Sequence, residues 1–73
     1  MLTDKNLTIL KNLGAKIKSI REEKGILQHD LAAMCNFEKS SMARIEAGRT
    51  NPTYLTLSKI AISLNLTISE LLK

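Results

Sequence analysis

Leucine and isoleucine recur at intervals of three and four residues through the first third of the sequence. The repeat comprises Leu7, Leu10, Leu13, Ile17 and Ile20. This spacing places the five side chains on one face of an α-helix. Lys24 followed by Gly25 predicts the end of that helix, because a cation suits the last turn and glycine readily adopts positive φ. No segment alternates apolar and polar residues as a half-buried strand does, so the pattern predicts an all-α chain.

Four shorter helices are predicted in the rest of the chain. Two cover residues 28–34 and 39–46, separated by a turn in which Asn36 is the residue best able to adopt a left-handed conformation. A fourth helix is capped by Thr53 and terminated by Asn65, and a capping-box pattern opens a fifth at residues 67–70. The positions of residues 28–34 that are predicted to be buried are Leu31, Ala32 and Met34. Five helices with tight connections predict a compact bundle.

The size and cysteine content of the chain limit what it can contain. Residues 1–73 are enough for one domain, in which residues 1–12 are predicted to be an N-terminal extension of the first helix. Cys35 is the single cysteine, expected in the core, so neither an internal disulfide nor a cysteine metal cluster is possible. The apolar runs are too short to span a bilayer, and no signal peptide is recognisable. We expect a cytoplasmic protein that uses no membrane, metal or cofactor.

The composition favours a binding protein over an enzyme. A domain this small has little room for an enclosed catalytic cavity, and its serines lack a matching histidine and acid. A phosphate-binding glycine-rich loop is also missing, so we expect neither catalysis nor a small-molecule ligand. The net charge of +4, from 11 basic and 7 acidic residues, favours polyanionic partners, with nucleic acid before an anionic membrane.

Residues 28–52 carry the strongest functional signal. Two short predicted helices flank a turn that contains Cys35-Asn36-Phe37, and a polar, basic loop follows the second helix. This is the arrangement of a helix-turn-helix, in which the first helix lies across the DNA backbone and the second presents its N-terminal side chains to base edges. Ala32 suits the point where the two helices cross, since a larger side chain would push them apart.

A wider set of residues, from position 13 to the C-terminus, supports this interpretation. The set comprises Leu13-Gly14, Ile17, Ile20-Arg21, Lys24-Gly25, Gln28, Leu31-Ala32, Ser40-Ser41, Arg44-Ile45-Glu46, Gly48, Asn51-Pro52, Ile60-Ala61 and Leu71. It spans roughly five-sixths of the chain and resembles the lambda-repressor-like, or Xre, helix-turn-helix family. The resemblance implies a compact, all-α DNA-binding domain of five helices.

The resemblance also implies a role for each matching position. The recognition helix is residues 39–46, and the residues that meet base edges in the major groove are Lys39, Ser40, Ala43 and Arg44. The residues that meet phosphates are Gln28, Arg49, Thr50 and Asn51. A structural ion pair is implied between Arg21 and Glu46.

The chemistry of individual residues leaves alternatives open. The guanidinium of Arg44 can bond guanine O6 and N7 together, clamp a phosphate or remain a solvated charge, and Gln28 can serve only to start its helix. Leu27 departs from the family pattern by replacing a Ser or Thr cap, which costs about 1 kcal/mol unless it packs into the core. Glu38 also departs from it, because its charge suits the helix dipole but repels phosphate, although it could accept a hydrogen bond from cytosine N4.

The leading hypothesis is a sequence-specific, repressor-like transcriptional regulator that binds double-stranded DNA as a homodimer. One short helix reads few base pairs, so two copies about one helical turn apart are the usual route to useful affinity. The candidate dimer surface is Ile62, Leu66, Ile68 and Leu72, unless these complete the monomer core. Alternatives are the DNA-binding antitoxin of a toxin–antitoxin pair, with a toxin as partner, a restriction–modification controller, and a protein-interaction adaptor that has lost DNA binding.

Overall fold

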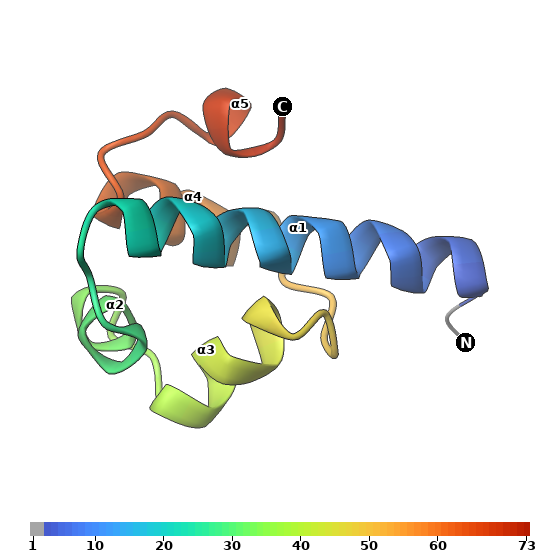
Figure 1. The fold of residues 1–73 in the computed structure, drawn as a ribbon, viewed down its shortest axis with the longest axis horizontal. Helices are drawn as coiled ribbons and strands as arrows, with labels where there is room; N and C mark the ends of the chain where they lie inside the picture. The colour runs from blue at the N-terminus through green and yellow to red at the C-terminus, as the bar shows by residue number, and fades with distance from the viewer. Residues whose placement is uncertain (1–2) are drawn as a thin grey trace.

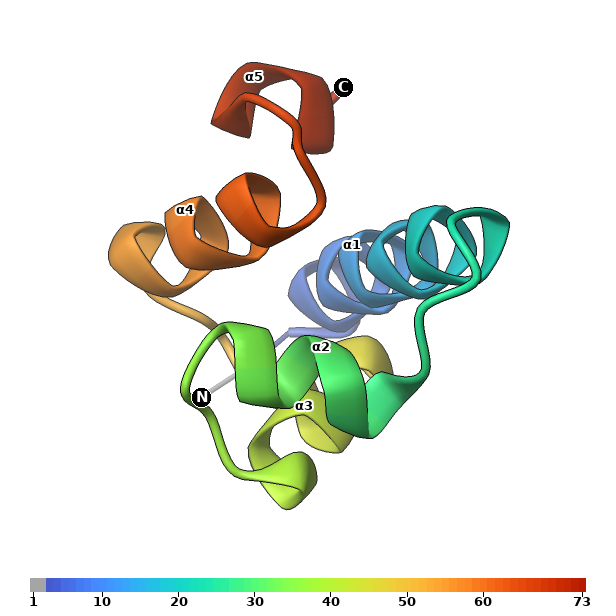
Figure 2. The same ribbon diagram turned by 90° about the vertical axis from the view of Figure 1, so that its left-hand side faces the viewer.

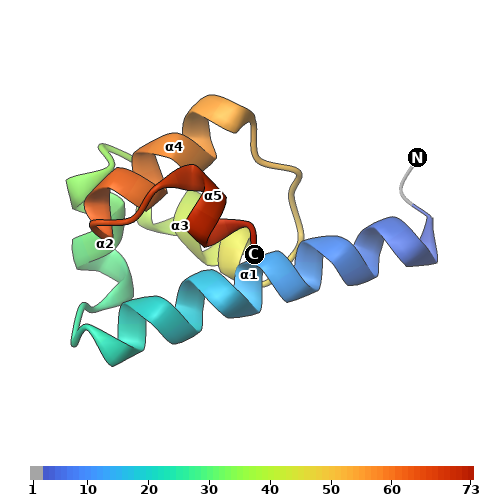
Figure 3. The same ribbon diagram turned by 90° about the horizontal axis from the view of Figure 1, so that it is seen from above.

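The computed structural model describes residues 3–73, which form five α-helices. The helices are α1 (Asp4–Glu23), α2 (Gln28–Met34), α3 (Lys39–Glu46), α4 (Tyr54–Ser63) and α5 (Ile68–Leu71). Figure 1 shows α2 to α5 gathered against the C-terminal part of α1, and Figure 3 shows the first turns of α1 projecting beyond them. The predicted all-α fold is confirmed, with no strand in the described range, and residues 1 and 2 of the predicted extension lie outside that range. Within residues 3–73 every helix is too short or too polar to cross a bilayer.

Threonine caps begin three of the five helices. The hydroxyls of Thr3, Thr53 and Thr67 each accept a hydrogen bond from the backbone N–H three residues later. Thr67 and Glu70 form the predicted capping box, in which each side chain accepts from the backbone of the other residue. The backbone N–H of Thr67, and then its side chain, lower the pKa of the exposed Glu70 carboxyl.

Asparagine ends two of the helices in the left-handed conformation. The φ angles of Asn36 and Asn65 are 58° and 61°, as expected of the residue type that tolerates this region best after glycine. Asn36 lies in the turn between α2 and α3, where it lets the chain change direction within four residues. The prediction for this turn is confirmed, and the turn brings α2 and α3 together as a helix-turn-helix.

The core joins all five helices. Its largest fully buried side chains are Ile17, Leu31, Met42, Ile60, Leu64 and Leu71. In Figure 2, α2 and α3 lie on one side of this centre and α4 and α5 on the other, with α1 beside both pairs. Cys35 is 4% exposed, so the expectation that it lies in the core is confirmed, and burial raises the pKa of its thiol.

One expectation about α2 is corrected, and one alternative that the sequence left open is decided. Met34 is 54% exposed, so the prediction that it is buried is wrong. The buried arc of α2 is set by Leu31, Ala32 and Cys35, and at about 100° per residue Met34 falls to one side of that arc. Leu27 begins α2 without a side-chain hydrogen bond and is 58% exposed, so burial does not replace the missing cap.

Two glycines set the distance between α1 and the C-terminal end of α3. A Cβ at Gly14 would lie 2.4 Å from the carbonyl oxygens of both Ile45 and Glu46. A Cβ at Gly48 would lie 2.6 Å from the Cα atom of Lys11, and Gly48 has a φ of +72°. Because backbone atoms cannot swing aside as a flexible side chain can, α1 approaches α3 this closely only with glycine at these positions.

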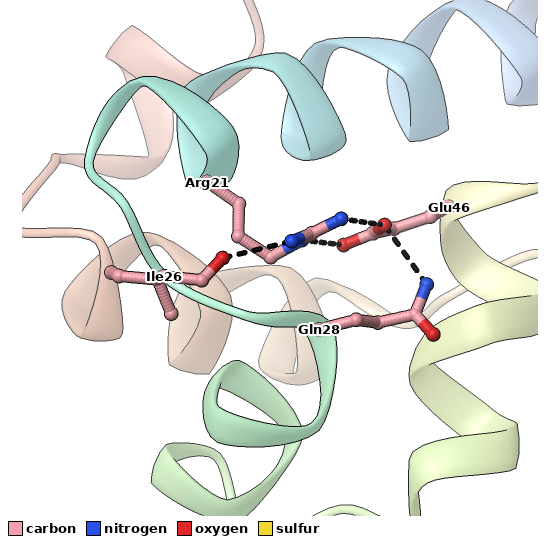
Figure 4. Close-up of polar contacts among 4 residues, drawn as sticks. All are labelled: Arg21, Ile26, Gln28 and Glu46. Atoms are coloured by element: carbon pink, nitrogen blue, oxygen red, sulfur yellow. Dashed lines mark hydrogen bonds and ion pairs between the residues drawn. The ribbon is translucent and has the colours of Figure 1, made fainter.

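A buried ion pair joins the same two helices (Figure 4). Arg21 Nε donates to Glu46 Oε2 at 2.8 Å and Nη2 donates to Oε1 at 3.0 Å, while Nη1 donates to the carbonyl oxygen of Ile26 at 2.8 Å. Arg21 and Glu46 are only 6% and 7% exposed. The hydrogen bond to Glu46 raises the pKa of Arg21 despite its burial, so the guanidinium stays charged. The predicted pair is confirmed, and it connects α1, the following loop and the end of α3.

Substituting Gly14 tests the contact between the helix backbones. Alanine normally stabilises a helix interior by about 1 kcal/mol relative to glycine. At this position we expect Gly14→Ala to lower the free energy of unfolding by about 2–3 kcal/mol, because the new methyl group overpacks the contact. Urea denaturation measures the change, and Ser19→Ala, at an exposed position of the same helix, is the control. Equal effects of the two substitutions would contradict the close contact.

Removing one charge of the ion pair tests its role. Glu46→Leu leaves the Arg21 guanidinium buried without an anion, and we expect it to cost about 3–5 kcal/mol of unfolding free energy. Arg21→Met combined with Glu46→Leu removes both charges, so the double variant is expected to be more stable than Glu46→Leu alone. Denaturation curves of the parent, Arg21→Met, Glu46→Leu and the double variant give the coupling. A double variant whose loss of stability equals the sum of the two single losses would mean that the two charges do not depend on each other.

Candidate nucleic-acid interface

The outer side of α3 carries an exposed basic edge. Lys39 and Ser40 occupy the first turn of α3, and both are exposed, as is Arg44 one turn later. Ala43, the fourth predicted base-edge residue, is half-buried, and a guanidinium nitrogen of Arg44 lies 3.5 Å from the Ser41 hydroxyl. Met42 and Ile45 hold the opposite side of α3 in the core, which leaves the polar side chains of its outer side accessible.

The loop after α3 continues this surface. Arg49 and Asn51 are exposed and Thr50 is half-buried, as part of the turn between α3 and α4. A groove of about 300 Å³ separates this loop from α3. Its lining includes Phe37, Ser41, Arg44, Thr50, Asn51 and Thr53. Of the predicted contact residues, the groove brings together Arg44, Thr50 and Asn51. Lys39, Ser40, Ala43 and Arg49 lie outside its lining.

Positive charge predominates along this surface. Between residues 38 and 51 the exposed cations are Lys39, Arg44 and Arg49, and the one exposed acid is Glu38. The other acid of the segment, Glu46, is buried against Arg21 and its charge is neutralised there. The exposed charges thus favour an anionic partner at short range.

Gln28 is less exposed than expected for a residue that only binds phosphate. It is half-buried at the start of α2, and its Nε2 donates to Glu46 Oε1 at 3.0 Å (Figure 4). The amide nitrogen has a second N–H group, so the contact with phosphate stays a prediction and is compatible with this hydrogen bond. The link from Gln28 to the ion pair is a structural role that the sequence pattern does not indicate, because the two residues are 18 positions apart.

Phe37 and Thr53 also belong to the surface, although neither matches a predicted contact. Phe37 lines the groove from the turn before α3, and Lys59 Nζ lies 6.0 Å from the centre of its ring. Thr53 lines it from the start of α4 while its hydroxyl caps that helix. Their only sequence signals are their places in a turn and at a helix cap. Among residues 3–73, no three His, Cys, Asp or Glu side chains come together as metal ligands would.

Known proteins resemble the chain in both sequence and fold. A family model described as helix-turn-helix (HTH_3) matches residues 17–71. An uncharacterised HTH-type transcriptional regulator, y4dJ of Sinorhizobium fredii, is 34% identical over 61 residues, which cover 84% of this chain and 79% of that protein.

Two solved structures have the same fold. The biofilm master regulator SinR, in complex with DNA, is 34% identical with a TM-score of 0.76, over 84% of this chain and 98% of that one. The restriction–modification controller protein C.Esp1396I is 33% identical with a TM-score of 0.78, over 88% of this chain and 86% of that one. The chain therefore belongs to the lambda-repressor-like (Xre) helix-turn-helix family.

Proposed function

We propose that this protein is a sequence-specific transcriptional regulator that binds double-stranded DNA with α3 in the major groove. The observation that carries the proposal is the exposure of Lys39, Ser40 and Arg44 on a helix whose other side is locked in the core. An α-helix with its side chains is about 10–12 Å across, which fits the width of the major groove, about 12 Å. The existence of a related regulator solved with DNA supports the same assignment.

Each part of the surface has a distinct task in this proposal. Arg44 reads a guanine through its two-pronged guanidinium, and Ser40, four residues earlier on the same face, contacts a neighbouring base. Arg49 and Asn51 hold the sugar-phosphate backbone and fix the register of α3 on the duplex. The proposal places the protein in the cytoplasm and assigns it neither a catalytic activity nor a cofactor.

A homodimer completes the proposal, because one α3 helix reads too few base pairs for strong selectivity. Leu66 and Ile68 pack against the monomer core, so they are less suited to a subunit contact. Leu55 and Ile62 are 65% and 75% exposed and lie seven residues apart, which puts them on one face of α4. Leu72 adds a third large apolar side chain, 52% exposed, beside α5. This α4–α5 surface is the proposed dimer contact.

Control of a restriction–modification operon is a narrower role that one observation favours. The structure of C.Esp1396I, named as such a controller, matches 88% of this chain. A nuclease gene and a methyltransferase gene beside the coding sequence would support that role, whereas a toxin gene there would favour an antitoxin.

Selection of bound duplexes from a random pool tests the main proposal. We expect an enriched motif with two-fold symmetry and half-sites about one helical turn apart. Gel shifts with the selected duplex and sedimentation of the complex then give its affinity and stoichiometry. A protein that stays monomeric and enriches no sequence would contradict the proposal.

Arginine substitutions distinguish base reading from phosphate binding. Arg44→Ala is expected to cost about 1–3 kcal/mol of binding to the selected operator and to relax the preference at one base pair per half-site. Arg49→Ala is expected to weaken binding to every sequence and to reduce the salt slope by about one per site. Both side chains are exposed, so circular dichroism should show an unchanged fold. If Arg44→Ala and Arg49→Ala lose the same binding free energy on every altered operator, the two arginines do not have these separate roles.

Ile62→Gln tests the dimer contact. In a symmetric dimer the substitution is present in both subunits, so the loss of apolar surface is doubled. We expect the dissociation constant of the dimer to rise about tenfold or more. Sedimentation equilibrium without DNA measures the effect. Leu27→Gln is the matched control, because Leu27 is 58% exposed on α2, outside the proposed contact. Equal dissociation constants for the two variants would place the dimer contact elsewhere.

A further inference from the structure

Glu38 begins α3 but does not cap it. Its backbone has the extended conformation of an N-cap residue, with φ −71° and ψ 149°, yet its carboxylate accepts no capping hydrogen bond. The hydroxyls of Thr3, Thr53 and Thr67 do accept such bonds at the same position of their helices. Glu38 is exposed, and within residues 3–73 the structure records no salt bridge to it. Within residues 3–73 the carboxylate therefore has neither a capping hydrogen bond nor a salt bridge, and its local effect is limited to the favourable dipole of α3.

The position of Glu38 makes an uncompensated carboxylate costly for DNA binding. It directly precedes Lys39 and Ser40, at the leading edge of the proposed recognition helix. A duplex docked on α3 would bring phosphate charges within the Debye length of about 8–10 Å, where the carboxylate opposes the attraction of the neighbouring cations. This opposition acts on every sequence unless a base edge supplies a hydrogen-bond donor.

Base edges in the major groove differ in what they offer a carboxylate. A carboxylate only accepts hydrogen bonds, so it is repelled by thymine O4 and by guanine O6 and N7, which are also acceptors. Cytosine N4 is a donor with no acceptor beside it on the same base, whereas adenine N6 lies next to the acceptor N7. Cytosine is therefore the base that best compensates the charge.

We propose that Glu38 is a specificity-determining residue that accepts a hydrogen bond from the N4 amine of one cytosine in each half-site. This inference rests on the proposed function, since it requires α3 in the major groove. A cytosine offsets the desolvation of the carboxylate, and any other base leaves it buried against an acceptor or without a partner. Glu38 thus strengthens selectivity mainly by penalising wrong sequences.

Selection from a random pool tests the inference with three proteins beside the parent. Glu38→Ala removes the acceptor, Glu38→Gln removes the charge but can pair with adenine N6 and N7, and Glu23→Gln makes the same charge change on the exposed surface of α1. We expect one cytosine per half-site in the parent motif, no preference there for Glu38→Ala, and adenine in its place for Glu38→Gln. Replacing this cytosine by thymine should weaken the parent about 5- to 150-fold and the alanine variant hardly at all.

Binding to a duplex that lacks the motif provides a second readout. Both Glu38 variants are expected to bind it several-fold more tightly than the parent, and more tightly than Glu23→Gln. The inference is overturned if both Glu38 variants select the same motif as the parent and bind the duplex without the motif as tightly as Glu23→Gln does. The proposed function stands in that case. If the parent selects no motif, the proposed function fails and the inference fails with it. Circular dichroism of each variant confirms that the fold is retained.

Discussion

The paired charges of Arg21 and Glu46 hold together the parts on which the rest of the molecule depends. Removing two such charges from water is costly, and here three hydrogen bonds from the guanidinium offset that cost. Those bonds reach α3 and the loop between α1 and α2, and Gln28 adds a fourth bond from the start of α2. One carboxylate therefore fixes the relative positions of three segments, and the angle at which α3 leaves the core follows from it.

The glycine contacts act on the same joint by steric means. Hydrogen bonds define the direction of the C-terminal end of α3, and the missing side chains at Gly14 and Gly48 define its distance from α1. Met42, which is fully buried, holds the N-terminal half of α3 in the core, while Lys39 and Ser40 remain exposed beside it. The polar surface of α3 and the following loop is thus a rigid platform, which lowers the entropic cost of binding a partner.

Most of the fold could be predicted because its signals are local. A cap such as Thr53 or a turn residue such as Asn36 acts within a few positions, so the sequence alone indicates where helices begin and end. Met34 was predicted wrongly because the buried arc of a seven-residue helix is decided by its neighbours, not by its own apolar character. The hydrogen bond from Gln28 to Glu46 needs the assembled fold, and no spacing rule contains it. For the interface, the sequence predicted that Lys39 is accessible, but which bases it meets depends on a duplex.

Residues of α3 divide sharply between those that hold the helix and those that face outward. Met42, Ile45 and Glu46 are buried, while Lys39 and Arg44 share little with them beyond the backbone. Exposed substitutions of this kind usually change stability by less than about 0.5 kcal/mol. Over evolutionary time, such a chain can acquire a new binding site on a genome by exchanging a few solvent-facing side chains, without first acquiring compensating changes in its interior. A duplicated copy could diverge in this way while remaining folded at every step.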